Sequence, residues 1–345
     1  MNDMKIVIPM AGIGKRLVQL TQHKPKALVR LADKRLIDHV LDIFKELEKS
    51  FTLEYIFIIG YLGEQIKEHM KNEHPDKNVS YYVQEQLLGQ SHAVQLAKDA
   101  ISGPILLTFC DTIIKTDFSF LPLETLDGVV WVQEVDDPRS HGVTIVDSDS
   151  LLTKLVEKPK TMKHKSVLTG LYYFSEGKEL IKAIDTQLGR NTTVNNEYYL
   201  ADAINVLVEK GKKIRTEKVL QWLDAGTPDA VLETNALLLK HNVNSYTELI
   251  SGQSNVLIPP NYIHESSRVE NSIIGPNVAI GKNCSINGSI IRNTIVDDDS
   301  HVHEVALENS LISKSCSLSG QRIQSITADN DQVRIFYEAG AKDKI

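Results

Sequence analysis

Three cysteines are too few, and too scattered, to hold this chain of 345 residues together. Cys110, Cys284 and Cys316 show no C-x-x-C spacing, so neither a disulfide framework nor a zinc site is expected. Long apolar runs are also missing: none approaches the roughly 18 to 20 residues that span a bilayer. The sequence therefore predicts a protein that neither depends on disulfides nor enters a membrane.

Positive charge is in deficit as well. Lys and Arg number 38 against 45 Asp and Glu, a net charge of −7, which argues against a generally basic nucleic-acid-binding protein. The first ten residues lack a charged segment followed by a long apolar one, so we expect no secretory signal and predict a cytoplasmic location. With 42% hydrophobic and 24% charged residues, the chain has the composition of a globular protein of two or three domains.

Short apolar runs alternate with amphipathic ones through residues 1–240. Lys5–Pro9, Tyr55–Ile59 and Ile105–Phe109 are typical of buried strands. Between them, Leu36–Leu47 and Glu64–Lys71 repeat apolar residues at the three- and four-residue spacing of helices. This alternation predicts an α/β fold, a Rossmann-like mixed sheet with helices on both faces. Closely spaced strands and turns over residues 128–174 indicate an antiparallel insertion at the sheet edge.

A different pattern follows a polar segment, residues 241–254, which we interpret as a linker. Aliphatic residues then recur every five or six positions between turn sequences such as Gly-Pro-Asn: Ile263, Val269, Ile274, Ile280, Ile286, Ile291, Val296 and Val302. This period is typical of a parallel β-helix, whereas an ordinary set of short strands would not keep it. We therefore expect a first domain over 1–240, hexapeptide-like β-helix repeats over 255–335 and a tail over 336–345.

The loop after the first strand, MAGIGKRL, carries the strongest chemical signal. Gly12 and Gly14 allow a ligand to approach the backbone closely, and consecutive N–H groups can form an anion-binding nest. A tight turn would also account for the two glycines. The cations that follow, Lys15 and Arg16, favour a polyphosphate site.

Two familiar phosphate-binding motifs do not fit this loop. A Walker A loop needs a glycine where Pro9 stands and Ser or Thr where Arg16 stands. A dinucleotide fingerprint needs a third glycine where Leu17 stands, so NAD binding is disfavoured. The sequence therefore indicates a phosphate site of another kind.

AGIGKRL followed by PKALV resembles the signature of the sugar nucleotidyltransferases, also called nucleoside-diphosphate-sugar pyrophosphorylases, and further motifs agree in order along the whole chain. The chain is most similar to bacterial glucose-1-phosphate thymidylyltransferase-like proteins that carry a C-terminal left-handed β-helix. The resemblance implies nucleotidyl transfer from a nucleoside triphosphate to a hexose 1-phosphate, with pyrophosphate released. It implies dTTP with glucose 1-phosphate first and UTP second, in the biosynthesis of cell-surface polysaccharides.

The resemblance assigns four residues to catalysis. Arg16 corresponds to the arginine that contacts the triphosphate, and Lys26 to the lysine of a Pro-Lys motif beside the α-phosphate. Asp111, which follows a buried strand, and Asp224, in a W-x-D-x-G-T motif, correspond to ligands of Mg²⁺. Two carboxylates suit the oxygen coordination of Mg²⁺ if the fold unites them.

The remaining assignments from the resemblance divide between nucleotide and sugar. A glutamine amide would read the pyrimidine edge, with a glycine that leaves room for the base, among these nucleotide-binding residues: Ala11, Gly12, Gly14, Lys15, Gln84 and Gly89. Four further motifs would bind the sugar phosphate through these residues: Gly142, Glu157, Lys158, Thr169, Gly170, Tyr172 and Glu197. The chain departs from the family pattern where Lys15 replaces a hydroxyl residue and Cys110 replaces a glycine.

The sequence leaves open two alternative functions, and it predicts self-association of the chain. The β-helix could make the chain a bifunctional acyltransferase, although His301 and His303 show no evident partner in the sequence. A non-catalytic sugar-nucleotide sensor would not need to keep both aspartates and both cations. The β-helix also makes a homo-oligomer, a dimer or tetramer, the expected assembly.

Overall fold

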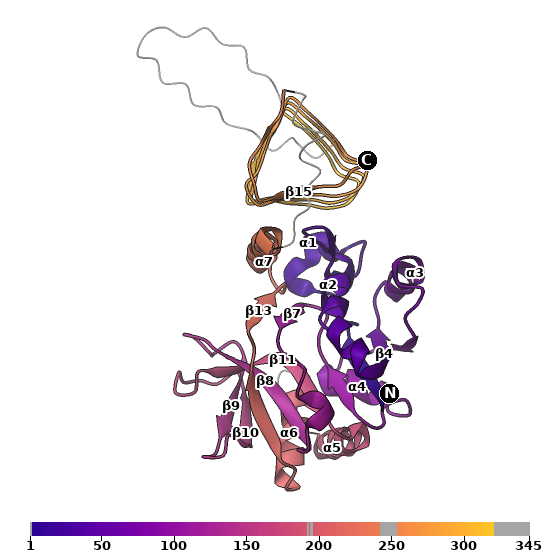
Figure 1. Cartoon of the computed structure of the whole chain (residues 1–345), viewed down its shortest axis with the longest axis vertical. Coiled ribbons are helices and arrows are strands. Elements are labelled where there is room, and N and C mark those ends of the chain that lie inside the picture. Colours follow the sequence, from indigo (N-terminus) through magenta and orange to yellow (C-terminus); the bar gives the residue numbers. More distant parts are fainter. Residues whose placement is uncertain (1, 192, 194–195, 242–253, 321–345) are drawn as a thin grey trace.

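The structure, a computed structural model, describes residues 2–191, 193, 196–241 and 254–320. An α/β domain occupies the first part of the chain, and a three-sided β-helix lies beside one end of it (Figure 1). The expected linker therefore lies outside the described residues except at its two ends, and the expected tail lies wholly outside them. Among the described residues, no helix is both long enough and apolar enough to cross a membrane.

A nine-stranded mixed sheet forms the centre of the α/β domain. In spatial order its main path is β10 (Leu152–Glu157), β9 (Gly142–Val146), β11 (Ser166–Phe174), β6 (Ile105–Leu107), β1 (Asn2–Pro9), β4 (Phe51–Ile59) and β5 (Val79–Val83), and β8 (Gly128–Glu134) and β12 (Ile214–Lys218) extend it beside β11. Strand β1 pairs in parallel with β4 and β6, whereas β11 is antiparallel to β6, β8 and β9. The expected mixed sheet with an antiparallel edge is confirmed.

Helices cover both faces of this sheet because side chains alternate along its strands. In β1, Ile6 and Ile8 belong to one apolar cluster and Val7 to another. The first cluster lies under α2 (Leu36–Asp42) and α3 (Gly63–Glu73). The second lies under α4 (Gln90–Leu96), α5 (Gly177–Arg190) and α6 (Leu200–Glu209). The core is therefore two layers, one on each side of the sheet.

A two-stranded antiparallel ribbon, β7 (Thr112–Lys115) with β13 (Gln221–Asp224), was not expected from the sequence. Its pairing joins segments that are far apart in the chain, with Thr112 opposite Asp224. Helix α7 (Pro228–His241) follows directly and ends the α/β domain. The ribbon positions two candidate site segments side by side.

The β-helix consists of three four-stranded parallel sheets, and its triangular outline is visible in Figure 1. Successive coils are in register after 17 or 16 residues: Val256 lies beside Ile273, Ile273 beside Ile290, and Ile290 beside Ala306. All eight aliphatic residues expected to point inward are at most 2% exposed. Corner residues adopt positive φ, which asparagine tolerates better than most residues, at Asn271, Asn277, Asn283, Asn293 and Asn309. The expected left-handed β-helix is confirmed, with strands β14 (Val256–Leu257) to β25 (Ser317–Ser319).

One sheet of the β-helix packs against the α/β domain. Ala279 and Ile295, on this sheet, belong to the same apolar cluster as the core under α2. Beside them, two acidic residues face three basic residues of the α/β domain, and we call these five the interdomain ion cluster: Lys24, Arg30, Arg35, Asp297 and Asp298. Apolar packing and buried charge therefore fix the two parts together.

Candidate active site

The loop that follows β1 lines a cavity of about 410 Å³. Gly14 has φ 73°, in the left-handed region, and Leu17 N donates a hydrogen bond to its carbonyl over 2.7 Å as the η1 turn (Lys15–Leu17) begins. Glycine adopts this conformation without strain. A Cβ at Gly12 would meet nothing within 4 Å, so the backbone there is open to the cavity.

The same cavity brings together most of the expected nucleotide site. All six residues assigned to the nucleotide line it: Ala11, Gly12, Gly14, Lys15, Gln84 and Gly89. Lys26 and Asp111 also line it, as does Glu197, which the resemblance assigns to the sugar. A concave site lined by backbone and a few charged groups is suited to an anionic ligand.

Lys26 and Asp111 form an ion pair at the edge of this cavity. Lys26 Nζ donates to Asp111 Oδ2 over 2.6 Å, and the two side chains are 10% and 27% exposed. The Pro25-Lys26 segment opens the short η2 turn (Lys26–Leu28), whereas Asp111 lies between β6 and β7. Each charge therefore holds the other while both stay within reach of a ligand.

Asp224 and Arg16 complete the charged group. Ala225 N donates to the Asp111 carbonyl over 3.0 Å, so the W-x-D-x-G-T segment runs directly beside Asp111. A Cβ at Gly226 would lie 2.8 Å from Arg16 Nη2 and 3.0 Å from Asp224 Oδ2, so these two side chains meet over the glycine. The structure therefore brings all four residues assigned to catalysis to one place.

The surrounding charges and burial shift the pKa of Asp224. Burial raises the pKa of Asp224, and the negative charge of Asp111 raises it further, while Lys26 and Arg16 act in the opposite direction. A nearby like charge disfavours the ionised form of a carboxyl group. Asp224 therefore ionises less readily than an ordinary aspartate.

Gln84 is 6% exposed, and its amide is held in one orientation. Nε2 donates to the Gly89 carbonyl over 3.2 Å and to His92 Nδ1 over 3.0 Å. Burial lowers the pKa of His92, which therefore remains a neutral acceptor. In the part of the chain that the structure describes, Oε1 accepts no hydrogen bond, and it is free to accept one from a ligand.

Gly89 has a structural requirement in addition to the role that the resemblance implies. Its φ is 105°, and a Cβ would lie 2.5 Å from Tyr198 N. Tyr198 N donates to the Leu88 carbonyl over 2.9 Å, and Ser91 N donates to the Tyr198 carbonyl over 3.1 Å. The glycine thus lets the segment that carries Glu197 pack beside it, and this explains why Glu197 reaches the nucleotide cavity.

A second, smaller cavity of about 170 Å³ adjoins the first, since Gln90 and Phe109 line both. Five of the residues assigned to the sugar line it: Gly142, Glu157, Thr169, Gly170 and Tyr172. Burial raises the pKa of Glu157. A partly buried carboxyl group of this kind suits hydrogen bonds with hydroxyl groups.

Three of the residues assigned to the sugar make contacts that the resemblance does not indicate. The Thr169 hydroxyl is buried and donates to the Trp131 carbonyl over 3.0 Å, so it supports the strand and not a ligand. Lys158 is not among the lining residues of the second cavity; its Nζ donates to the Tyr199 hydroxyl over 3.0 Å. Glu197 lines the first cavity. Lys158 and Glu197 therefore do not line the second cavity in this conformation, and Thr169 lines it with its hydroxyl already bonded to the backbone.

Two aromatic rings stand out among the residues of the second cavity that were not assigned from the sequence. His141 and Trp222 line it with their ring centroids 5.4 Å apart. Both neighbour assigned residues, Gly142 and Asp224, so motif position was the one signal that could have found them. Burial lowers the pKa of His141, which favours the neutral ring.

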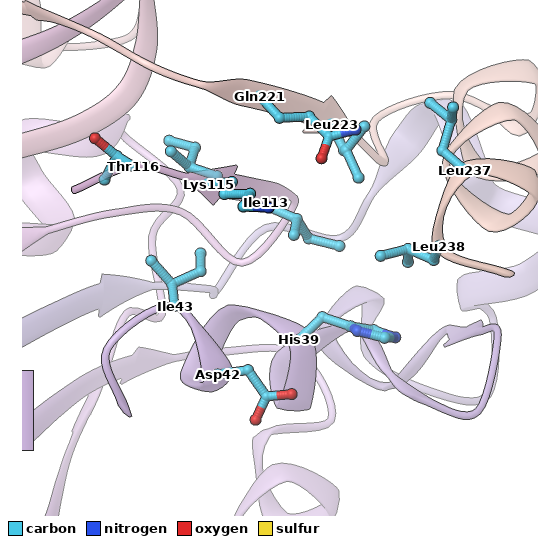
Figure 2. Close-up of a pocket in the computed structure, with 11 residues that line it drawn as sticks. His39, Asp42, Ile43, Ile113, Lys115, Thr116, Gln221, Leu223, Leu237 and Leu238 are labelled. Carbon is cyan, nitrogen blue, oxygen red and sulfur yellow. The ribbon is translucent and has the colours of Figure 1, made fainter. Parts of the chain in front are cut away.

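A third cavity, of about 450 Å³, lies between α2, α7 and the β7–β13 ribbon (Figure 2). Most of its lining is aliphatic, and none of the residues assigned from the sequence line it. Two of its polar side chains are engaged elsewhere: Asp42 pairs with Lys34 and Lys45, and His39 Nε2 donates to the Leu31 carbonyl over 2.9 Å. The convergent charges lie in the first cavity, which is the candidate active site.

Comparison with known proteins agrees with this geometry. The family described as "Nucleotidyl transferase" matches residues 5–241. The "Bifunctional protein GlmU" of Methanococcus aeolicus is 27% identical over 87% of this chain and 76% of its own length. The "Low-salt glycan biosynthesis nucleotidyltransferase Agl11" of Haloferax volcanii is also 27% identical, over 87% of this chain and 89% of its own.

The solved structure of a UDP-glucose pyrophosphorylase complexed with UDP-glucose has the same fold, with a TM-score of 0.59 and 18% identity over 70% of this chain and all of that one. The chain matches only part of the length of some relatives. It spans 54% to 62% of three further proteins with the bifunctional name, from Methanococcus and Methanocaldococcus.

Proposed function

The chain belongs to the nucleotidyl transferase family, and on this premise we propose that it transfers a nucleotidyl group from a pyrimidine nucleoside triphosphate to a hexose 1-phosphate. dTTP with glucose 1-phosphate is the pair we propose first, and UTP with the same sugar phosphate is the alternative. One observation carries the proposal: Arg16, Lys26, Asp111 and Asp224 come together at the edge of the first cavity, which the second cavity adjoins.

The chemistry requires two polyanions to be held together. A phosphate oxygen of the hexose 1-phosphate attacks the α-phosphorus, the bond to the β-phosphate oxygen breaks, and pyrophosphate leaves with that electron pair. Catalysis of such a step is mainly positioning and charge stabilisation. Lys26 would stabilise the α-phosphate, and the planar fork of Arg16 would hold the departing pyrophosphate.

Gln84 supports a pyrimidine over a purine. Its Oε1 is free to accept the N3–H of thymine or uracil, which present the same hydrogen-bonding edge. Because this edge does not include the methyl group or the 2′-position, Gln84 supports dTTP and UTP equally. Glu157, in the second cavity, would accept hydrogen bonds from sugar hydroxyls.

Mg²⁺ is the metal that we propose for the candidate active site. Asp111 and Asp224 would hold it, because two carboxylates supply only oxygen, the ligand that Mg²⁺ prefers. The raised pKa of Asp224 beside Asp111 supports a cation there. When bound, the metal would neutralise charge on the triphosphate.

The experiment is a matrix of five nucleoside triphosphates against glucose, galactose, mannose and N-acetylglucosamine 1-phosphates, with Mg²⁺, in which pyrophosphate release is measured. We expect turnover with dTTP or UTP and glucose 1-phosphate. Omitting the sugar phosphate controls for simple hydrolysis. Release with no pair would overturn the proposed function, and release with purine nucleotides alone would overturn the role of Gln84.

A further inference from the structure

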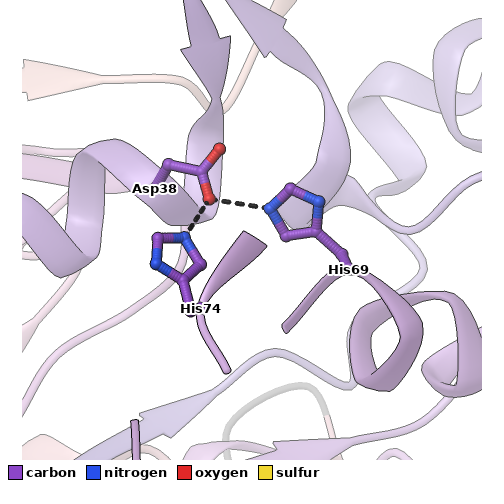
Figure 3. A group of neighbouring side chains, drawn as sticks. All are labelled: Asp38, His69 and His74. Atoms are coloured by element: carbon purple, nitrogen blue, oxygen red, sulfur yellow. Dashed lines mark hydrogen bonds and ion pairs between the residues drawn. The ribbon is translucent and has the colours of Figure 1, made fainter. Parts of the chain in front are cut away.

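One carboxylate and two imidazoles form a cluster between α2 and α3, outside both cavities of the candidate active site (Figure 3). Asp38 comes from α2, His69 from the last turns of α3 and His74 from the residue that ends α3. Asp38 Oδ1 lies 2.7 Å from His69 Nε2 and 2.8 Å from His74 Nε2. The three donor atoms all lie within 4.8 Å of one another.

The end of helix α3 places both histidines on one side. His74 leaves the helical conformation, with φ −136° and ψ 52°, while its N–H still donates to the Met70 carbonyl over 2.9 Å. Its ring consequently turns back toward His69, and the two ring centroids are 6.0 Å apart. The C-terminal end of a helix favours a positive charge.

A backbone hydrogen bond fixes the orientation of the Asp38 carboxylate. Its second oxygen, Oδ2, accepts the Arg35 N–H over 3.0 Å at the start of α2, which leaves Oδ1 directed at the imidazoles. The side chains of Asp38, His69 and His74 are 14%, 14% and 20% exposed. Such support of a ligand by an outer hydrogen bond is typical of metal sites in proteins.

We propose that Asp38, His69 and His74 bind one divalent transition-metal ion, of which Zn²⁺ is the representative. Two imidazoles and one carboxylate are a donor set that Zn²⁺ takes in proteins, with water in the fourth position. Bonds of about 2.0–2.2 Å in a tetrahedron place donor atoms roughly 3.3–3.5 Å apart. The two spacings between Asp38 and the histidines, 2.7 and 2.8 Å, would open by about 0.5–0.8 Å as the metal replaces each Nε2 proton.

The donor set separates this site from the one at Asp111 and Asp224. Mg²⁺ prefers oxygen ligands, so nitrogen donors discriminate against it. The site would cross-link α2 and α3. Tyr61, just before α3, and Gln65, in its first turn, also hold the loop before Lys26. Tyr61 Oη donates to the Gln22 carbonyl over 2.6 Å, and Gln65 Nε2 donates to the His23 carbonyl over 3.0 Å. A metal-bound α3 would therefore brace this loop.

The test uses the full chain, freed of metal with a chelator, and titrates Zn²⁺ calorimetrically and Co²⁺ by its visible spectrum. We expect one tetrahedral site per chain. His69→Gln with His74→Gln should weaken binding by more than about 100-fold, since loss of an outer partner alone costs 10–100-fold. The matched control is His301→Gln with His303→Gln, two exposed histidines on β22 (His301–His303), and it should leave the site unchanged.

Two further measurements distinguish loss of this metal site from binding at the active site and from unfolding of the variant. Asp111→Asn with Asp224→Asn should retain the Co²⁺ spectrum, and thermal unfolding of each variant without metal would show whether it folds. If the double histidine variant does not fold, His69→Gln and His74→Gln are titrated singly. Failure of the wild-type chain to bind, or unchanged binding without the histidines, overturns the proposal. Neither result affects pyrophosphate release with Mg²⁺, so the proposed function is tested separately.

Discussion

Burial raises the pKa of Asp224, and the negative charge of Asp111 nearby raises it further. We propose that Mg²⁺, together with Lys26 and Arg16, offsets the negative charge of these two carboxylates. Asp111→Asn and Asp224→Asn should therefore each lower the rate of pyrophosphate release by at least about 10³-fold, because charge stabilisation dominates such reactions. Steady-state kinetics would measure this loss.

A matched control for these variants is Asp136→Asn, which removes a fully exposed carboxylate on another loop. It should leave the rate within a factor of about two, since surface substitutions have small effects. The thermal midpoints of all three variants should stay close to the wild type. Wild-type rates in either active-site variant would contradict the metal role.

Gln84 makes a narrower prediction. Gln84→Ala should lower kcat/KM for dTTP and UTP alike, by about 10- to 100-fold, the effect of one lost hydrogen bond to a ligand together with the polar groups left unpaired. The KM for the sugar phosphate should not change. Gln86→Ala, an exposed residue two positions on, is the control. A loss confined to one of the two nucleotides would contradict a shared base edge.

Secondary-structure elements show what the sequence could predict. The apolar runs predicted β1, β4 and β6 because each is a largely buried run with strong strand propensity. The β7–β13 ribbon was not expected, since its four-residue strands have no pattern of their own and depend on long-range pairing. The resemblance located Asp111 and Asp224, but the pairing of Thr112 with Asp224 explains why they meet.

The β-helix was predicted in more detail than the α/β site. Its inward residues repeat at short range, so one pattern fixes the whole stack. By contrast, the different positions of Thr169, Lys158 and Glu197 depend on partners far along the chain, such as Trp131 and Tyr199. Single residues in motifs could not indicate which partner they would take.

The approach of the segment around Tyr198 to Gly89 gives a prediction at the scale of elements. Gly89→Ala should displace that segment and lower activity, at a cost of about 1–3 kcal/mol for a side chain in this backbone conformation. Gly189→Ala is the control, because nothing lies within 4 Å of its Cβ position in helix α5. It should stabilise the helix by up to about 1 kcal/mol. Unchanged activity of Gly89→Ala in a thermal and kinetic comparison would contradict this role.

At the scale of the whole molecule, the interdomain ion cluster joins the β-helix to the loop that carries Lys26. Lys24, two residues before Lys26, pairs with Asp297, and Arg30 Nη2 donates to Asp298 Oδ1 over 2.7 Å. Replacing both acids by asparagine would leave three cations without their partners. We expect a destabilisation of about 3–5 kcal/mol, as for a broken buried pair, measured by denaturant unfolding of the full chain.

The same cluster predicts a pH dependence. Burial opposes ionisation of Asp297, but the charges of Lys24 and Arg35 hold its pKa well below the ordinary value. A depressed folded-state pKa stabilises the fold above the unfolded value of about 3.9, and this contribution is lost as the pH falls below it. The loss of stability between about pH 5 and pH 3 should be smaller in the double asparagine variant. An equal loss in both chains would contradict the prediction.

Assembly is a further property at this scale. The α/β domain covers one sheet of the β-helix, and Val256 and Ile290 on another sheet are 53% and 43% exposed. Self-association of the chain as a dimer or tetramer stays a prediction, and light scattering of the full chain would test it. A monomer at micromolar concentration would contradict it.

The central claim is that the cavity beside β1 performs nucleotidyl transfer. The most direct measurement is the pyrophosphate released in a single turnover, with Mg²⁺, glucose 1-phosphate and dTTP or UTP, by the wild-type chain and by Asp224→Asn. The account predicts about one pyrophosphate per active chain for the wild type and almost none for the variant. Equal release from both chains, or none from the wild type with either nucleotide, would contradict it.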